Sequence, residues 1–269
     1  MKMRFFALTA ALVFCCLPVH AASVDGVHLH WTSHGVGPRT IILVHGWTAD
    51  ESAWSEQVSA LSRNYRVITL DLPGHGHSAM PEAFSIELCA RAVEVVRAEA
   101  RANRVVLAGH DVGAMVIRKY ALMYPSRVFG LVLVDGHIPI PDGRPGPPAH
   151  VLTVTAARRE SMIRDSFGEM TSPELQERIR KMMLAPPDTT ATGTLNALHD
   201  RSQWTNDRVT VPVLAVYSGL GMLATEREVK TLFPMAEYHR IPGTGHFVMM
   251  EAPAPVNRLI EGFLSRIGF

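Results

Sequence analysis

Hydrophobic positions along the chain alternate between short, continuous apolar runs and longer segments with helical spacing. The apolar runs predict buried parallel strands, at residues 40–44, 66–70, 105–108, 131–134 and 212–217. The helical spacing covers residues 54–61, 86–102, 114–124, 226–233 and 256–267. Alternating polarity predicts an edge strand at residues 27–31 and a last short strand at 237–241. Together these patterns predict an α/β fold with a mostly parallel central sheet flanked by helices.

The alternation stops between residues 137 and 210, where no convincing strand pattern occurs. A proline-rich stretch opens this region, and helical segments are expected at residues 151–166, 172–184 and 194–204. We therefore expect a helical cap, residues 137–210, inserted after the sixth strand. Residues 22–136 and 211–269 would form the α/β core domain into which this cap is inserted.

The first 21 residues have the pattern of a secretory signal peptide. Met1–Arg4 is positively charged, Phe5–Pro18 is apolar, and Val19–Ala21 offers small residues at the cleavage positions. The apolar run is too short to span a membrane. We expect cleavage after Ala21 and a secreted or periplasmic protein. A buried N-terminal helix, or a lipoprotein anchored through Cys15, is the alternative.

Charge and cysteine content indicate which binding partners and which covalent cross-links to expect. The 269 residues carry 26 basic and 25 acidic side chains, so no basic excess points to nucleic acid, and no motif for it occurs. Loss of the signal peptide would leave Cys89 as the single cysteine, which excludes an intramolecular disulfide. A chain of this length can be held by its core alone.

A strand, a sharp glycine-flanked turn and a helix meet at Gly109-His110-Asp111-Val112-Gly113. This is the context of a nucleophile elbow, which lifts one side chain above the sheet edge beside a helix N-terminus. The residue in the central position is Asp111. An ordinary helix N-cap is the alternative role for this aspartate.

Three further motifs follow predicted strands in a fixed order, and with the elbow they resemble the α/β-hydrolase family. They are His45-Gly46, the stretch Asp71-Leu72-Pro73-Gly74-His75-Gly76, and Gly245-His246-Phe247. The resemblance covers essentially all of the chain after the signal peptide. It implies that Asp111 is a nucleophile and that His246 is a general base.

The resemblance also implies an acid that orients His246 and an oxyanion hole. No carboxylate follows the strand at 212–217, so we assign the acid to Asp135, after the preceding strand; a plain Asp-Gly turn is the alternative. The backbone amides of Trp47 and Val112 would form the oxyanion hole. Asp71 and His75 are interpreted as structural residues.

An aspartate nucleophile favours displacement at saturated carbon, because its attack on an ester would leave an anhydride, which lies uphill. The expected intermediate is an alkyl ester on Asp111, which water activated by His246 then hydrolyses. This chemistry resembles that of epoxide hydrolases, which we place first, and of haloalkane dehalogenases, which we place second. The expected substrate is a small apolar organic molecule.

The leaving group needs a proton or hydrogen-bond donor, and epoxide hydrolases usually supply cap tyrosines. Residues 137–210 contain no tyrosine. The candidate contacts that remain are Trp47, His150, His199 and Trp204, with His137 at the entrance of the cap. Their alternatives are core packing for the tryptophans and solvation for the histidines.

The remaining expectations concern the pocket and the competing class of function. Apolar cap residues could line the pocket or only pack on the core: Met162, Met182, Met183 and Leu195. Apart from Asp111, the chain resembles small secreted serine hydrolases, so a carboxylesterase-like hydrolase or a non-catalytic binding protein is the alternative function. No metal-ligand cluster or nucleotide-binding loop is apparent, and we expect neither cofactor nor metal.

Overall fold

The computed structural model describes residues 22–138, 153–221 and 223–269. The predicted signal peptide and the candidate contact His150 lie outside these described residues. No helix within the described ranges combines the length and the apolar character that crossing a membrane requires.

A seven-stranded sheet forms the centre of the molecule, with the order β3-β5-β4-β6-β7-β8-β9. Its strands are β3 (Trp31–His34), β4 (Thr40–Val44), β5 (Arg66–Leu70), β6 (Val105–His110), β7 (Val128–Val134), β8 (Val213–Ser218) and β9 (Ala236–Ile241). The edge strand β3 is antiparallel to β5, and the other neighbours are parallel. The mostly parallel sheet expected from the apolar runs is therefore confirmed.

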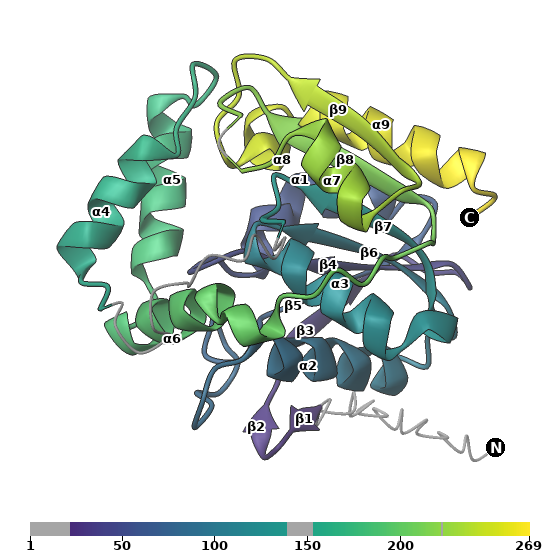
Figure 1. Ribbon diagram of the computed structural model, residues 1–269, viewed down its shortest axis with the longest axis horizontal. Coiled ribbons are helices and arrows are strands. Elements are labelled where there is room, and N and C mark those ends of the chain that lie inside the picture. Colours follow the sequence, from purple (N-terminus) through teal and green to yellow (C-terminus); the bar gives the residue numbers. More distant parts are fainter. Residues whose placement is uncertain (1–21, 139–152, 222) are drawn as a thin grey trace, which may run out of the picture.

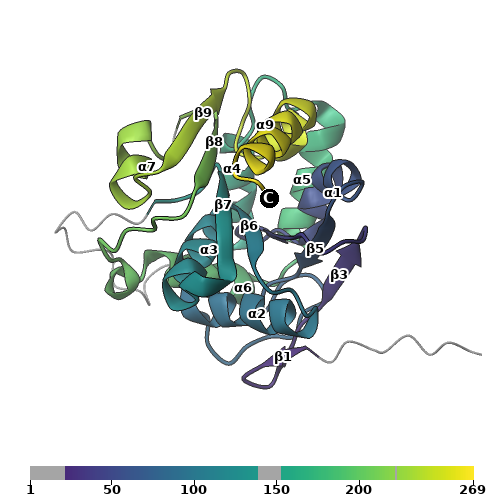
Figure 2. The same cartoon turned by 90° about the vertical axis from the view of Figure 1, so that its right-hand side faces the viewer.

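Helices cover both faces of this sheet, which is why its central strands are apolar throughout. Figure 2 shows α1 (Ser55–Leu61) and α9 (Pro253–Arg266) on one face, and α2 (Ile86–Glu99) and α3 (Val112–Met123) on the other. Two shorter helices complete the core: α7 (Glu226–Leu232) and α8 (Val248–Glu251). All five residues of β4 are buried, as a strand covered on both faces requires.

The N-terminal edge differs from the prediction of one strand at residues 27–31. Two-residue strands β1 (Ser23–Val24) and β2 (Val27–His28) pair with each other in a separate hairpin. Asp25 and Gly26 both have positive φ, 49° and 80°, the conformation that a tight Asp-Gly hairpin turn requires. The chain reaches the main sheet only at β3.

The described residues between β7 and β8 form a helical segment, residues 153–210, at one end of the sheet (Figure 1). It contains α4 (Ala156–Asp165), α5 (Pro173–Leu184), α6 (Asp188–His199) and the 3-10 turn η3 (Arg201–Gln203). The segment follows the fifth strand of the main sheet in chain order. The expected position after a sixth strand is therefore corrected to the fifth, since the main-sheet strands before residue 137 are β3 to β7.

The last helix of this segment, α6, starts at Asp188 and not at the expected residue 194. The weak helix formers Thr189, Thr190, Thr192 and Gly193 hid its first turns from the sequence pattern. Pro187 stands directly before it as the N-cap residue, and the proline pair 186–187 separates it from α5. Contacts of α6 with distant parts of the chain, such as the Trp47 bond to Ala191, outweigh the low helix propensity of this stretch.

The strand order places a topological switch point in the middle of the sheet. β4 has β5 on one side and β6 on the other, so the chain changes direction there. In open α/β sheets the carboxyl ends of two such strands leave a crevice between their outgoing loops. Here those loops begin at His45 after β4 and at Asp111 after β6.

Candidate active site

Asp111 occupies the sharp turn between β6 and α3 with φ 51° and ψ −116°. Two glycines make this turn possible. A Cβ on Gly109 would lie 2.3 Å from the Gly113 carbonyl oxygen, and one on Gly113 would lie 2.4 Å from the Val44 carbonyl oxygen. The Asp111 side chain makes no capping hydrogen bond to α3. The N-cap alternative is therefore wrong, and the carboxylate points elsewhere.

The carboxylate of Asp111 is held from the loop that follows β4. The backbone N–H of Trp47 donates to its Oδ2 at 2.9 Å. Gly46 allows this approach, because a Cβ there would lie 2.8 Å from the Asp111 Cβ. The structure thus brings together Asp111 and the Trp47 amide that the sequence assigned to the oxyanion hole. The Val112 amide, the first in α3, stays a prediction for the second donor.

His246 lies between two carboxylates. Its Nδ1 is 2.8 Å from Asp135 Oδ2, and its Nε2 is 3.9 Å from Asp111 Oδ1. Asp135 Oδ1 accepts the backbone N–H of Ser218 at 2.9 Å. The side chains of Asp111 and His246 keep 14% and 15% exposure, so both retain some contact with solvent. All three residues of the expected constellation are thus brought together, with Asp135 in the orienting position.

Electrostatics couple these three groups. Burial by itself lowers the pKa of His246, but hydrogen bonding and charge from Asp111 and Asp135 outweigh it and raise this pKa to about 10. Burial favours the neutral form of Asp111, yet His246, His110 and the Trp47 amide hold its pKa well below the usual range. The pKa of Asp135 is also lowered, against burial, chiefly by His246. At neutral pH the free site therefore holds an imidazolium between two carboxylates.

His110, next to Asp111 in the turn, is a neighbour of the site that no sequence pattern singled out. Its ring lies 4.5 Å from the His246 ring, and its Nε2 is 3.0 Å from the His246 carbonyl oxygen. Burial and the charge of His246 lower the pKa of His110 to about 4. This imidazole is neutral and supports the backbone of the loop that carries His246.

The tryptophans that the sequence offered as leaving-group contacts use their indole N–H groups elsewhere. Trp47 Nε1 donates to the Ala191 carbonyl at 2.8 Å, and Trp204 Nε1 donates to the Leu198 carbonyl at 3.1 Å. Both acceptors belong to the backbone of α6. The Trp47 bond docks α6 over the loop after β4, the Trp204 bond stays within the helical segment, and neither indole N–H is left for a substrate.

Two histidines near α6 differ in whether their ring nitrogens have hydrogen-bond partners. His199 Nδ1 lies 2.8 Å from the Leu195 carbonyl oxygen in its own helix. His137 contacts the Trp204 ring at 5.7 Å, and its Nε2 is buried without a hydrogen-bond partner in the described part of the chain. Burial lowers the pKa of His137, while the charge of Asp111 acts on it in the opposite direction. From the sequence, we placed His137 only at the entrance of the cap, without a role of its own.

Asp71 and His75 hold loops in place, as expected. Asp71 is fully buried, and its Oδ1 accepts the backbone N–H of Glu51 at 2.9 Å. His75 packs on His45 at 5.0 Å, and burial lowers the pKa of His75 to about 3. The backbone N–H of Leu72 donates to His45 Nε2, which joins the loops after β4 and β5.

The profile of the alpha/beta hydrolase family matches residues 41–259. The chain belongs to this family. A pimeloyl-(acyl-carrier protein) methyl ester esterase of Vibrio campbellii is 29% identical, over 89% of this chain and 97% of that protein.

Solved structures show the same fold. A thermophilic esterase from Thermogutta terrifontis has a TM-score of 0.81 at 25% identity, covering 92% of this chain and 97% of the esterase. The epoxide hydrolase CorEH has a TM-score of 0.76 at 21% identity, covering 91% and 97%. At that identity the second likeness concerns the fold alone. Family membership is therefore shown, while the branch that uses an aspartate is not.

Within this α/β-hydrolase, the apolar residues expected in the pocket are packed among other side chains. Met182, Met183 and Leu195 are buried in the hydrophobic cluster, and Met162 packs against it from a half-buried position. Packing of the helical segment on the core accounts for all four. Whether any of them also contacts a substrate stays a prediction.

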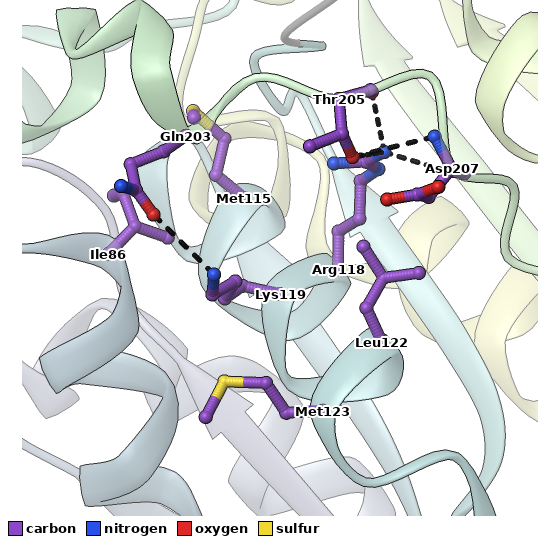
Figure 3. Close-up of a pocket in the computed structure, with 9 residues that line it drawn as sticks. All are labelled: Ile86, Met115, Arg118, Lys119, Leu122, Met123, Gln203, Thr205 and Asp207. Atoms are coloured by element: carbon purple, nitrogen blue, oxygen red, sulfur yellow. Dashed lines mark hydrogen bonds between the residues drawn. The ribbon is translucent and has the colours of Figure 1, made fainter.

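A separate pocket of about 160 Å³ lies along α3, beyond its first turn (Figure 3). Figure 3 shows Arg118 at its wall, where Nη2 donates to the carbonyl oxygens of Thr205 and Asp207. Met115, Leu122 and Met123 line the apolar side. Asp111 and His246 do not line it, so this pocket is distinct from the candidate active site.

Proposed function

We propose that this chain is a secreted, cofactor-free hydrolase that opens epoxides through a covalent ester on Asp111. The observation that carries the proposal is the setting of Asp111. Its carboxylate stands at a strained elbow, is held by the Trp47 amide and faces His246, while it caps no helix. An anion in this place, one-seventh exposed, is positioned to attack an electrophilic carbon.

The charge state of the free site matches the needs of epoxide opening. One oxygen of Asp111 attacks an epoxide carbon, the C–O bond breaks, and an alkoxide forms that needs one proton. The site begins with two carboxylates, Asp111 and Asp135, and one imidazolium, because His246 has a pKa of about 10. Ester formation removes the Asp111 charge that keeps His246 protonated. The proton that His246 gives up therefore balances the proton that the alkoxide takes.

The second step restores the starting state. Neutral His246, oriented by Asp135, takes a proton from water, and the hydroxide attacks the ester carbonyl of Asp111. The oxyanion forms on the Asp111 side chain, where the Trp47 N–H already donates to Oδ2 at 2.9 Å. Collapse releases a diol and leaves Asp111 ionised and His246 protonated. The sum of both steps is one epoxide and one water converted to one diol.

We assign stabilisation of the developing alkoxide to His137, which would donate a hydrogen bond to the epoxide oxygen while the transferred proton comes from His246. Residues 137–210 contain no tyrosine, so the usual donors of epoxide hydrolases have no counterpart there. The buried, unpartnered Nε2 of His137 and the influence of the Asp111 charge support this assignment. A neutral imidazole whose ring nitrogen carries hydrogen can donate to a developing alkoxide.

Haloalkane dehalogenation fits less well for two reasons. Halide departure leaves no alkoxide, so the His246 proton would have to leave the site for solvent. The indole N–H groups of Trp47 and Trp204, which could hold a halide, donate to backbone carbonyls of α6. Carboxylic ester hydrolysis is the second candidate, because the relatives named above are esterases.

Single-turnover hydrolysis in ¹⁸O-water tests the proposal. With an epoxide such as styrene oxide, the peptide that contains Asp111 should gain one ¹⁸O per turnover. His246→Gln should accumulate enzyme whose mass is raised by that of the epoxide. Absence of label with epoxides, together with efficient cleavage of aryl esters, would overturn the proposal in favour of an esterase. Gain of esterase activity in Asp111→Ser would indicate descent from a serine esterase and would not bear on the ¹⁸O-labelling result.

A further inference from the structure

A cluster of two histidines and two carboxylates lies at the antiparallel edge of the sheet, outside the candidate active site. His30 directly precedes β3, Asp71 directly follows β5, and His77 lies in the loop after Asp71. Glu51 opens the 3-10 turn η1 (Glu51–Trp54). We propose that His30, His77 and Asp71 form a Zn²⁺ site, with Glu51 beside His30 as an outer partner, although the sequence patterns led us to expect no metal.

The distances match those between ligands of one metal ion. Ligands at about 2.0–2.2 Å from a tetrahedral Zn²⁺ lie about 3.3–3.6 Å from one another. Here His77 Nδ1 is 3.5 Å from Asp71 Oδ2, while Glu51 Oε1 lies 3.2 Å from His30 Nε2 and orients that ring. Ligand atoms of His30, Asp71 and His77 all lie within 4.8 Å of one another. The His77 side chain is 80% exposed and can turn to close the remaining gap.

The charge of the cluster calls for a divalent cation. Asp71 and Glu51 each form an ion pair with a histidine, and the ion pairs that they form within the described residues involve neither Lys nor Arg. The rings of His30 and His77 lie 4.9 Å apart, so two imidazolium charges there would repel each other. Two neutral imidazoles and two carboxylates together carry a charge of −2, which one Zn²⁺ neutralises. Imidazole nitrogen and carboxylate oxygen are both ligands that Zn²⁺ accepts.

The carboxylates are already oriented by a second set of hydrogen bonds. Thr32 and Thr69 donate their hydroxyls to Glu51, at 3.2 and 2.5 Å. The backbone N–H groups of Glu51 and His77 donate to Asp71, at 2.9 and 2.8 Å. Such outer partners fix metal ligands before the ion arrives. Asp71, interpreted from sequence as purely structural, thereby gains a second role.

The bound ion would join three separate parts of the chain. It would tie the residue before β3 to the loop after β5 and, through the contact between His30 and Glu51, to η1. The turn η1 follows closely on the loop that carries Trp47, whose amide holds Asp111. Zinc should therefore raise the thermal stability of the fold and steady the oxyanion loop, without touching the reacting groups.

Calorimetric titration of ZnCl₂ into the full-length chain, after dialysis against EDTA, tests the site. One zinc per chain should bind to the wild type, and His77→Ala should weaken this binding by at least about tenfold. His77 is so exposed that its replacement leaves the fold undisturbed. His30→Ala should weaken binding equally, and His28→Ala, which removes an exposed histidine of β2, should have no effect.

Cobalt provides the spectroscopic check, because tetrahedral Co²⁺ absorbs visible light strongly. The wild type and His28→Ala should show this absorption, and His77→Ala should lose it. Unchanged zinc affinity in both His77→Ala and His30→Ala would overturn the proposal. Loss of the bound zinc in His246→Ala would also overturn it, because the metal would then lie at the active site. Wild-type binding weaker than millimolar would equally reject a built site.

Discussion

Nδ1 of His246 lies 2.8 Å from Oδ2 of Asp135, although 111 positions separate the two residues in the chain. The contact fixes the ring so that Nε2 faces Asp111. It also keeps a negative charge beside the imidazole when Asp111 has become an ester. His246 can then accept a proton from water, which the hydrolysis step requires.

Asp135→Asn should slow hydrolysis of the ester far more than its formation. The amide keeps the shape of the side chain but removes the charge that stabilises the imidazolium, and we expect kcat to fall by about 10⁴-fold. Intact mass measurement during turnover should show accumulated alkyl-enzyme. Asp165→Asn, which changes an exposed carboxylate of α4, serves as the control and should behave as the wild type. Equal loss of both steps would contradict the orienting role.

The free energy of unfolding should fall as the pH rises from 7 to 10.5. The pKa of His246 is about 10 in the fold and near 6.5 when unfolded, so its contribution is complete below pH 6.5. It is lost as the pH rises through 10. Asp111→Asn removes one of the two carboxylates that raise this pKa and should lose less stability over the same range. Urea denaturation of both proteins at the two pH values measures the difference, and parallel losses would refute the coupling.

Gly113→Ala should destabilise the fold by about 3 kcal/mol. Its Cβ would lie 2.4 Å from the backbone oxygen of Val44, where nothing flexible can yield. Gly262→Ala is the matched control in α9, since its Cβ would meet only the tip of Arg266, at 3.1 Å. That variant should be stabilised by up to about 1 kcal/mol. Chemical denaturation compares them, and equal effects would argue against the close approach of α3 to β4.

His137→Phe should lower kcat for epoxides by about 10²–10⁴-fold and leave the fold at least as stable. The replacement removes a buried ring nitrogen that lacks a partner among the described residues. Alkylation of Asp111 by an alkyl iodide, which needs no proton, should keep its rate. His199→Gln is the control, because Nδ1 of His199 lies against its own helix backbone. Equal slowing with epoxide and iodide would assign His137 a role in packing.

Expression in a bacterium should yield a periplasmic or secreted protein that begins at Ala22. The charged, apolar and small-residue regions before that position carry this expectation. N-terminal sequencing of the exported protein measures it. An intact Met1 on a folded cytoplasmic product would refute export, and a lipid attached at Cys15 would identify the lipoprotein alternative.

Local sequence patterns predicted much of the fold because parallel strands buried on both faces must be continuously apolar. The runs at β4, β5, β6, β7 and β8 follow from this requirement. The same patterns failed where local signals were weak. The Asp25-Gly26 turn diverts two short strands from the sheet, and α6 starts in a threonine-rich stretch that tertiary contacts hold helical.

The sequence by itself determined the turn that presents Asp111, because glycines two residues before and after it are local requirements. Tertiary structure decided everything that depends on distant partners. It docked the Trp47 indole on α6, paired Asp135 with His246, left His137 Nε2 without a described partner, and placed His30 beside His77. Sequence spacing cannot give such contacts, because strand order and the position of the helical segment set which chain-distant side chains meet.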